Sequence, residues 1–432
     1  MPQRLEQLPA AQRQSCSSVG PPEASTSNSP APQGPLAGFK VLDLGQVVAG
    51  NFCGAILAYF GADVIKVEPP GRGDALRSLR ATDSTGTSLW WRSYGRNRRC
   101  MTVDLHKEEG RELVRALAAK VDVLVENFRP GVMEKWQLGP QDLPAHLVYT
   151  RISGYGQTGP KASLPGYASV CEAYGGFRHL NGYLDRPPVR PNISLGDSLA
   201  GLHAAFGAVM ALLHRQRATS GNQAGGQVVD AAISESMFNM LDSCVSEYAM
   251  QGYDRPASGS TISGIVPSAT MKTRDGKYVI IGGNGESIYT RLMAAVGRPD
   301  MGADNPKYAN NTKRCEHEAE IYEVLEGWVA QHSLPEVVEA MKAARVPCGP
   351  ILSTGDIYHE EQYRQRDMFH TATTPSGSEP IVMSAIVPKL SATPGATRWA
   401  GPDLGEHMEE ILREELQLSE ARIAELRGMG AI

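Results

Sequence analysis

Apolar and polar positions alternate in blocks along residues 38–160, and the blocks predict strands separated by helices. Short apolar runs that are typical of buried strands stand at Phe39–Leu44, Ala62–Glu68, Val121–Glu126 and Leu147–Ile152. A helical stretch follows Gly50 and runs to Phe60, and the four-residue spacing of Leu113 and Leu117 indicates a helix over Glu108–Lys120. Helices that alternate with strands are typical of a parallel sheet, so we expect an α/β fold.

A longer helical pattern occupies residues 192–214 and contains one carboxylate, Asp197. Large apolar side chains recur there at three- and four-residue intervals, at Leu199, Leu202, Phe206, Val209 and Leu213. Alanines and glycines fill the positions between them, and small residues let neighbouring backbones approach closely. We therefore expect a buried helix with a single acid near its N-terminus.

The character of the chain changes near residue 250. Asp254–Gly264 has the composition of a loop, and Arg274–Lys277 is a turn signal between two apolar stretches, which predicts a hairpin. Two helical segments follow, near 287–297 and 317–331. These features predict a small middle domain over 250–330 between a first part of a large domain, 38–228, and its return, 346–432. The return carries a strand-like stretch, Ile381–Pro388, and a final helix after Asp403.

Residues 1–36 differ from the rest because they contain seven prolines and six serines and almost no large apolar residue after Leu8. Such a segment buries too little surface to offset its ordering entropy, so we expect a disordered extension. A mitochondrial transit peptide is the alternative, supported by serines and by Arg4 and Arg13. The expected location is accordingly the cytoplasm or the mitochondrial matrix.

Composition excludes several functional classes. The net charge of −5 argues against a nucleic-acid surface or an anionic membrane surface as partner. No window approaches 18 uninterrupted apolar residues, so no transmembrane helix is expected. The seven cysteines are scattered without a CxxC pair, and the ten histidines lack HxH or HxxxH spacing. This pattern indicates reduced thiols and no structural metal.

Two interpretations of Asp197 are compatible with its position. Asp is among the preferred N-cap residues, because its oxygens accept N–H bonds from the first turn of a helix. The same helix terminus also keeps a carboxylate ionised, and an ionised carboxylate can attack a thioester carbonyl. Gly196 has no side chain and would leave room for the carbonyl.

Further polar and glycine-rich segments follow two predicted strands. Arg151–Pro160 has glycines at 154, 156 and 159, whose backbone N–H groups could approach a phosphate or a carbonyl, or which could form an ordinary turn. Asn127, after another strand, could bind a ligand or cap a helix. A third group combines Arg92, Arg96, Arg98 and Arg99 with aromatic residues, which suits either a nucleotide with phosphates or a solvated loop.

Seven segments together resemble the family III CoA-transferases, which include formyl-CoA, carnitine and succinyl-CoA:glutarate CoA-transferases. They occur in the family's order and span about 38–432: Gly38–Gly45, Leu57–Pro70, Asn97–Cys100, Val125–Phe128, Ser153–Pro160, Gly196–Ser198 and Pro347–Pro350. The resemblance implies a large domain with a Rossmann-like core formed by both chain ends, a small middle α+β domain, and an interlocked homodimer. It also implies that Asp197 is the nucleophile.

The resemblance implies a binding site for coenzyme A, used as a thioester substrate and not as a permanent cofactor. The implied contacts are Val48, Ala49, Val103, Asp104, Leu105, His106, Asn127, Phe128, Arg129, Ser153, Gly154, Tyr155, Gly156 and Gln157. A glycine loop over the acyl group is implied within Gly259–Gly264.

Two departures from relatives narrow the expected reaction. Val48 stands where formyl-CoA transferase has Gln, which disfavours a formyl or oxalyl substrate. Tyr167 stands where the related racemases carry a histidine base, so proton abstraction lacks its partner. We therefore expect an acyl-CoA:carboxylate CoA-transferase, with succinyl-CoA as the candidate donor, acting on a small carboxylic or dicarboxylic acid through an aspartyl intermediate. An acyl-CoA racemase of the same fold and a non-catalytic CoA-binding dimer are the alternatives.

Overall fold

The computed structural model describes residues 34–217 and 225–432 and divides them into two compact units. The first unit contains the described residues up to Pro165, together with Asp197–Ala232 and Glu361–Ile432. The second contains Gly166–Gly196 and Ile233–Glu360. Of the expected extension 1–36, residues 1–33 lie outside the described residues. The second unit differs from the expected middle domain, since it also takes 166–196 and continues to Glu360.

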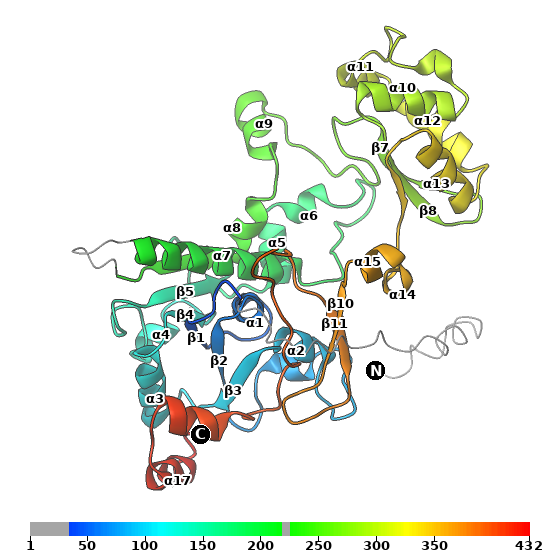
Figure 1. Ribbon diagram of the computed structural model, residues 1–432. Helices are drawn as coiled ribbons and strands as arrows, with labels where there is room; N and C mark the ends of the chain where they lie inside the picture. Colours follow the sequence, from blue (N-terminus) through cyan, green and yellow to red (C-terminus); the bar gives the residue numbers. More distant parts are fainter. Residues whose placement is uncertain (1–33, 218–224) are drawn as a thin grey trace. The chain divides into compact units, whose positions relative to one another are not determined.

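A six-stranded sheet forms the centre of the first unit (Figure 1). Its strands pair in parallel in the order β3-β2-β1-β4-β5-β6, which is the Rossmann order and agrees with the expected α/β fold. The order reverses between β1 and β4, where ligands bind in open α/β sheets. The strands are β1 Lys40–Asp43, β2 Asp63–Glu68, β3 Arg98–Thr102, β4 Val123–Glu126, β5 Val148–Ser153 and β6 Val228–Ala232.

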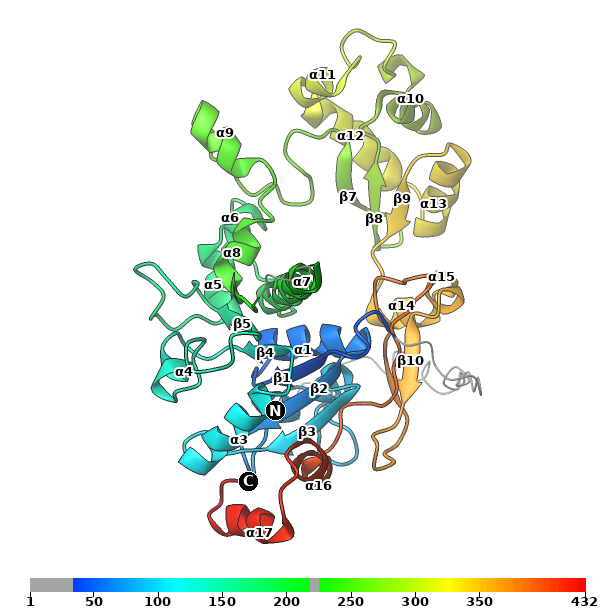
Figure 2. The same cartoon turned by 60° about the vertical axis from the view of Figure 1, so that its left-hand side comes forward.

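Helices cover both faces of this sheet (Figures 1 and 2). Helices α1 and α7 lie on one face, while α3 and the C-terminal helices lie on the other. Strand residues such as Leu42 and Leu124 form a buried cluster with Leu117 of α3. The helices of this unit are α1 Ala49–Tyr59, η3 Ala75–Ser78, α2 Leu89–Tyr94, α3 Glu108–Ala118, α4 Val132–Lys135, α7 Leu195–Arg217, α15 Glu361–Gln365, α16 Met408–Glu410, η5 Ile411–Glu415 and α17 Glu420–Gly428.

The C-terminal part of the chain completes the first unit, as the resemblance implied. Strands β10 (Phe369–Ala372) and β11 (Ile381–Ser384) form a separate antiparallel pair. Ile411 and Leu412, and then Ile423 and Leu426 of α17, join the same core cluster as β1 and α3. Both chain ends therefore contribute to one hydrophobic core.

Helix α7 was expected to be buried, and it is buried mainly along its face of small residues. Its alanines, for example Ala200, Ala204 and Ala208, are fully buried, whereas Leu202 and Phe206 are exposed. Small residues permit this, because a Cβ at Gly207 would lie only 2.6 Å from Val229 of β6. Helix α7 is long and apolar enough to span a membrane by length and composition, and it is the one such helix in the described ranges. Its close packing against the sheet is typical of a core helix of a globular protein.

The second unit has its own sheet and core. Strands β7 and β8 form the predicted antiparallel hairpin, and β9 pairs with β8. Val279 and Ile281 of β8 pack with Leu325 of α12 in a separate buried cluster. Its elements are α5 Ala168–Tyr174, α6 Phe177–Leu180, α8 Ile233–Phe238, α9 Cys244–Gln251, β7 Ser268–Lys272, β8 Tyr278–Gly282, α10 Glu286–Ala295, η4 Pro299–Met301, α11 Asn311–Glu316, α12 Glu318–Val329, α13 Leu334–Ala343, β9 Cys348–Pro350 and α14 Thr354–His359.

Candidate active site

A short loop, Gly45–Val48, leaves β1 at the point where the strand order reverses. Asn127, the first residue after β4, holds this loop from the neighbouring strand. The Asn127 side chain accepts the Gln46 N–H at 2.6 Å and donates to the Gln46 carbonyl at 2.8 Å. Because both backbone groups of Gln46 are bonded to one side chain, the loop is fixed across the switch point of the sheet.

The loop contains an unfavourable backbone conformation. Val47 has a φ of 60°, a left-handed value that is costly for a β-branched residue. Its N–H donates to Asp74 Oδ1 at 3.0 Å, and Asp74 also accepts the Asn51 amide at 2.7 Å. Such strain persists only where the surroundings over-determine the structure.

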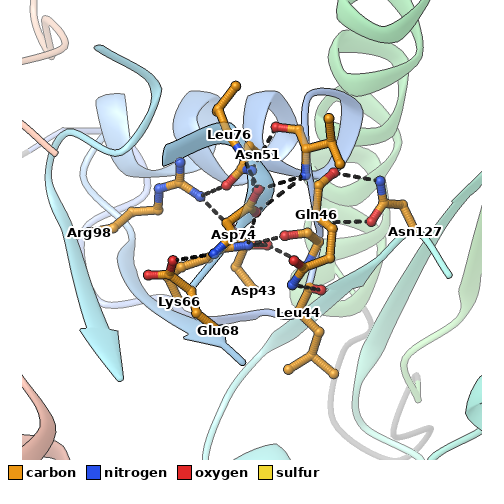
Figure 3. A network of polar contacts seen from close by, with 12 residues as sticks. Asp43, Leu44, Gln46, Asn51, Lys66, Glu68, Asp74, Leu76, Arg98 and Asn127 are labelled. Atoms are coloured by element: carbon orange, nitrogen blue, oxygen red, sulfur yellow. Dashed lines mark hydrogen bonds and ion pairs between the residues drawn. The ribbon is translucent and has the colours of Figure 1, made fainter. Parts of the chain in front are cut away.

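A buried ionic network underlies the loop (Figure 3). Lys66 Nζ donates to the Gly45 carbonyl and lies 3.4 Å from Asp74 and 3.8 Å from Asp43. Arg98 bonds Asp43 at 2.5 Å. These four charged side chains are 0–1% exposed, and two cations face two anions. Since buried charges are tolerated only when paired, the network fixes β1, β2, β3 and the loop relative to one another.

A second ion pair extends the network toward β2. Arg77 binds Glu68 through two bonds, at 2.6 and 2.7 Å, and Glu68 also accepts the Asp74 N–H at 2.9 Å. Bidentate arginine–carboxylate pairs are geometrically specific. The turn that carries Asp74 is thereby attached to the end of β2.

A pocket opens beside this loop and contains five of the implied CoA contacts. Val103, Asp104, Leu105, His106 and Phe128 line it, so residues from two separate strand ends meet there. Trp136 packs edge-on against both His106 and Phe128, with ring centroids 5.7 and 5.1 Å apart. The remaining lining residues, all absent from the sequence prediction, are Leu44, Gln46, Val67, Glu68, Pro69, Arg72 and Trp136.

The pocket combines aromatic walls with one cation. Arg72 stands in the Pro-Pro-Gly-Arg-Gly turn after β2, with His106 and Asp104 on another part of the wall. Apolar and aromatic surfaces bind the flat base of a nucleotide, and an arginine binds phosphate. The sequence signal for Arg72 was its position in the turn that follows a predicted strand, at the edge where ligands bind.

The other implied CoA contacts do not line this pocket. Asn127 fixes Gln46, while Arg129 is exposed. Val48 and Ala49 are buried, and Val48 packs with Trp91 and Leu76.

The segment Ser153–Gln157 lies at the end of β5, next to β4 in the sheet. Ser153 accepts the Gly156 N–H at 2.9 Å, and Gly156 has a φ of 89° that favours glycine. The Gln157 N–H donates to Asp230 at 3.0 Å, whereas its side-chain nitrogen is buried without a partner in the described ranges. Gly154 and Tyr155 are half-buried in the same turn. This turn therefore offers an amide donor to a ligand.

Burial also affects an acid at the end of β4. It raises the pKa of Glu126 to about 7, against the opposing charge of Arg151. Glu126 accepts the Phe128 N–H at 2.7 Å and the Arg151 Nε–H at 2.7 Å. A carboxyl group retains acceptor capacity in both protonation states, so Phe128 keeps its anchor on either side of neutral pH.

Asp197 is the third residue of α7 and therefore not its N-cap. The N-cap interpretation is therefore wrong. The Asp197 side chain is half-buried and belongs to the first turn of the helix, where the helix dipole favours negative charge. One turn later, a Cβ at Gly201 would lie 2.6 Å from the Ala49 carbonyl and 3.1 Å from Phe52. The first turns of α7 thus contact the start of α1, which directly follows the loop Gly45–Val48.

The arginine-rich segment is structural, and neither the nucleotide interpretation nor the solvated-loop interpretation is correct. Arg92 bonds Asp83 at 2.7 Å and pairs with Asp403 at 2.9 Å. Arg96 donates to the Ser384 carbonyl at 2.8 Å, and Arg99 binds carboxylates of β2 and of the C-terminal helices. These arginines are therefore paired with groups of the protein that lie far away in the sequence.

The glycine loop lies in the second unit. Gly259 has a φ of 65°, and its N–H donates to the Gly182 carbonyl at 2.8 Å. A Cβ at Gly259 would lie 2.8 Å from the Tyr183 ring. Gly264 has a φ of 77°, and its carbonyl accepts the Asn311 amide at 2.7 Å. The positive φ at both positions favours glycine, and at Gly259 the close approach of the Tyr183 ring favours it as well.

Comparisons with known proteins agree with this fold. The sequence pattern of CoA-transferase family III matches residues 36–408. The succinyl-CoA–D-citramalate CoA-transferase of Chloroflexus aurantiacus is 41% identical over 94% of this chain and 100% of that protein. The mouse succinyl-CoA:glutarate CoA-transferase is 32% identical over 92% of this chain and 90% of that protein. A crystal structure of a CAIB/BAIF family protein from Brucella suis superposes with a TM-score of 0.76 at 30% identity, covering 89% of this chain and 100% of that one.

The chain therefore belongs to CoA-transferase family III. It is an enzyme of the CoA-transferase class, and its substrates include a CoA thioester.

Proposed function

We propose that the protein transfers CoA from succinyl-CoA to a small dicarboxylic acid through a covalent intermediate on Asp197. The named activities of the similar proteins support the substrates, since they act on succinyl-CoA with citramalate, malate or glutarate. The family assignment supports CoA transfer itself.

One structural observation carries the proposal: a single segment connects the pocket with the nucleophile's helix. Gln46 lines the pocket, and three residues later the Ala49 carbonyl contacts Gly201 of α7. Asp197 lies one turn before Gly201. A CoA whose nucleotide occupies the pocket can therefore extend its pantetheine arm along the loop Gly45–Val48 toward the first turn of α7.

The chemistry follows from a carboxylate nucleophile. An Asp197 oxygen attacks the thioester carbonyl of the donor, the C–S bond breaks, and the CoA thiolate leaves with its electron pair. The thiolate then attacks the aspartyl carbonyl of the mixed anhydride, which gives an aspartyl-CoA thioester and releases the donor carboxylate. The acceptor carboxylate reverses both steps and leaves as a new acyl-CoA. Dividing one difficult substitution into easier ones is the benefit of covalent catalysis.

We further propose that the other implied residues serve this reaction. Val103–His106 and Phe128 hold the nucleotide, while Asn127, Val48 and Ala49 position the loop. The turn Ser153–Gln157 contacts CoA with its N–H groups and the Gln157 amide, and Arg129 interacts with its exposed phosphates. The loop Gly259–Gly264 covers the acyl group and limits hydrolysis.

We also propose that the active protein is an interlocked homodimer. Leu202, Phe206 and Met210 form an exposed apolar stripe along α7, at 47, 60 and 45% exposure. A contiguous apolar stripe on a helix is typical of an interaction surface. Multi-angle light scattering should give twice the chain mass of 46.5 kDa.

The test is to incubate the protein with succinyl-CoA and free acids, and to identify new acyl-CoA species by mass spectrometry. We expect glutaryl-, malyl- or citramalyl-CoA to form with an equal release of succinate. Configurational exchange of a 2-methylacyl-CoA without any new thioester would instead support the racemase. Absence of both reactions across the panel would contradict the proposed function.

A further inference from the structure

The Gln46 side chain starts from a backbone that side chains of other elements hold in place. Asn127 bonds both the N–H and the carbonyl of Gln46, at 2.6 and 2.8 Å (Figure 3). The next residue is held in the same way, because Asp74 accepts the Val47 N–H at 3.0 Å and Asn51 donates to the Val47 carbonyl at 2.8 Å. The direction in which the Gln46 side chain leaves the loop is therefore fixed before any ligand binds.

The amide group of this side chain retains hydrogen-bonding capacity. Gln46 is half-buried and lines the pocket. Its Nε2 lies 3.4 Å from the Leu44 carbonyl, which is longer than an ordinary N–H···O bond, and its Oε1 has no hydrogen-bond partner among residues 34–217 and 225–432. A glutamine amide offers an acceptor and two donors side by side. The pocket therefore contains a positioned donor and acceptor that a ligand can use.

The rest of the lining suits the base and the phosphates of a nucleotide. Leu44 and Val67 supply apolar surface, and the rings of Phe128 and Trp136 meet edge-on at 79°. A flat base can stack on surfaces of this kind. Arg72 is exposed at the pocket and takes part in no ion pair within the part of the chain that the structure describes. Its guanidinium is therefore available to a phosphate.

The two carboxylates in the lining are already bonded to the protein. Arg77 binds both oxygens of Glu68, at 2.6 and 2.7 Å. Asp104 Oδ1 accepts the His106 N–H at 2.9 Å. The unpaired arginine and the Gln46 amide are therefore among the polar groups that remain for a ligand.

We infer that the Gln46 amide reads the adenine base of CoA. This inference rests on the proposed function only in that the nucleotide of CoA occupies the pocket. Gln46 Oε1 accepts an N–H of the adenine amino group, and Nε2 donates to the ring nitrogen beside it. Glutamine forms this bidentate pair with adenine where proteins read bases directly. Gln46 thus determines specificity for the base, whereas Arg72 contributes affinity for phosphate.

The test compares CoA with its ethenoadenine analogue, in which a two-carbon bridge joins the amino group to the neighbouring ring nitrogen and removes the N–H donors. Isothermal titration of the full-length protein measures Kd for both ligands. Gln46→Leu and Gln46→Met each remove the amide and keep much of its volume. Arg72→Gln is the matched control, because it changes the cation of the same pocket and leaves the Gln46 amide in place.

We expect the wild type to bind CoA on the order of 10-fold more tightly than the analogue, as loss of a bidentate pair implies. In both Gln46 variants the ratio of the two Kd values should approach one, because CoA binds more weakly. Arg72→Gln should weaken both ligands and leave the ratio unchanged. The bonds from Asn127 reach only the backbone of Gln46, so both variants should fold, which thermal unfolding will check.

Two results would overturn the inference while leaving CoA transfer intact. The wild type could bind CoA and the analogue equally well, so that no group reads the base. Alternatively, the preference for CoA could persist in both Gln46 variants, which would assign base recognition to another group. A wild type that prefers CoA to the analogue but forms no new thioester with any free acid would instead contradict the proposed function.

Discussion

Replacing Lys66 by methionine tests whether the buried network holds the loop that borders the pocket. Lys66 is fully buried, donates to the Gly45 carbonyl and faces Asp43 and Asp74 at 3.8 and 3.4 Å. Methionine fills most of the space but removes the charge. Asp43 then keeps its pair with Arg98, Asp74 loses the cation that faces it at 3.4 Å, and Gly45 loses its donor.

The expected cost is that of breaking a buried ion pair, about 3–5 kcal/mol. For a unit of this size, about 2–4 °C per kcal/mol corresponds to a melting temperature lower by roughly 10 °C. Lys40→Met is the matched control: Lys40 stands on the adjacent strand β1 and pairs with Glu415 at 2.7 Å, but its side chain is 39% exposed. Exposed pairs of this kind contribute about 0–1 kcal/mol.

Urea unfolding followed by circular dichroism measures both variants, and isothermal titration with CoA measures the effect on the pocket. Lys66→Met should also weaken CoA binding at a temperature where the protein is folded, because the loop Gly45–Val48 is no longer fixed. If Lys66→Met and Lys40→Met lie within about 1 kcal/mol of each other, the network does not contribute as argued.

Two further predictions concern the glycine loop and pH. Gly259→Ala should lower CoA transfer and raise thioester hydrolysis more than Gly264→Ala does. Both variants place an alanine at a positive φ, but only the new Cβ at residue 259 would lie 2.8 Å from a ring, that of Tyr183. Coupled transfer and thiol-release assays measure both rates, and equal effects of the two variants would contradict the role of the Tyr183 contact. Burial lowers the pKa of His407, whose Nδ1 accepts the Cys100 N–H at 3.3 Å. As pH falls, His407 is therefore protonated in the unfolded chain at a higher pH than in the folded protein. The neutral, buried His407 contributes to the free energy of unfolding above about pH 6.5, and this contribution is lost as pH falls toward the lower pKa of the folded protein. Between pH 8 and 5 the stability of His407→Gln should fall less than that of the wild type; parallel curves would show that His407 does not titrate in this way.

Much of the sheet could be predicted because its strands are buried on both faces. Each of the four predicted apolar runs agrees within two residues at either end with a strand, and β4 is buried along its whole length. Strand β3 was missed because it begins with Arg98 and Arg99, which resemble a polar loop. Their partners, Asp43 and Glu415, lie far away in the sequence, and no local pattern records such pairing.

The burial of α7 was predicted only in part, for a related reason. The pattern offered two faces, one of large apolar residues and one of small ones, and hydrophobicity favours burial of the first. Close backbone contacts instead select the small face, as Gly201 against Ala49 and Gly207 against Val229 demonstrate. Which face of the helix is buried depends on the residues that pack against it in the folded protein, and the sequence of the helix alone does not identify them.

The candidate site was predicted in part. Strand ends identified Asn127 and the turn after β5, and the resemblance supplied Val103–His106 and Phe128. Gln46, Arg72 and Trp136 were missed, because they join the pocket through a strained loop, a turn and an aromatic contact that depend on the assembled sheet.

The most direct test of the account is to trap the covalent intermediate on Asp197. Incubation with succinyl-CoA alone should load the protein with an activated acyl group or with CoA, and hydroxylamine should then convert Asp197 to a hydroxamate. Tandem mass spectrometry would locate this mass change in a peptide spanning Pro191–His214, and Asp197→Asn is the control that should remain unmodified. The account predicts modification of Asp197 that depends on the acyl-CoA. An unmodified Asp197 across several acyl-CoA donors, together with rapid turnover when an acceptor acid is present, would contradict it.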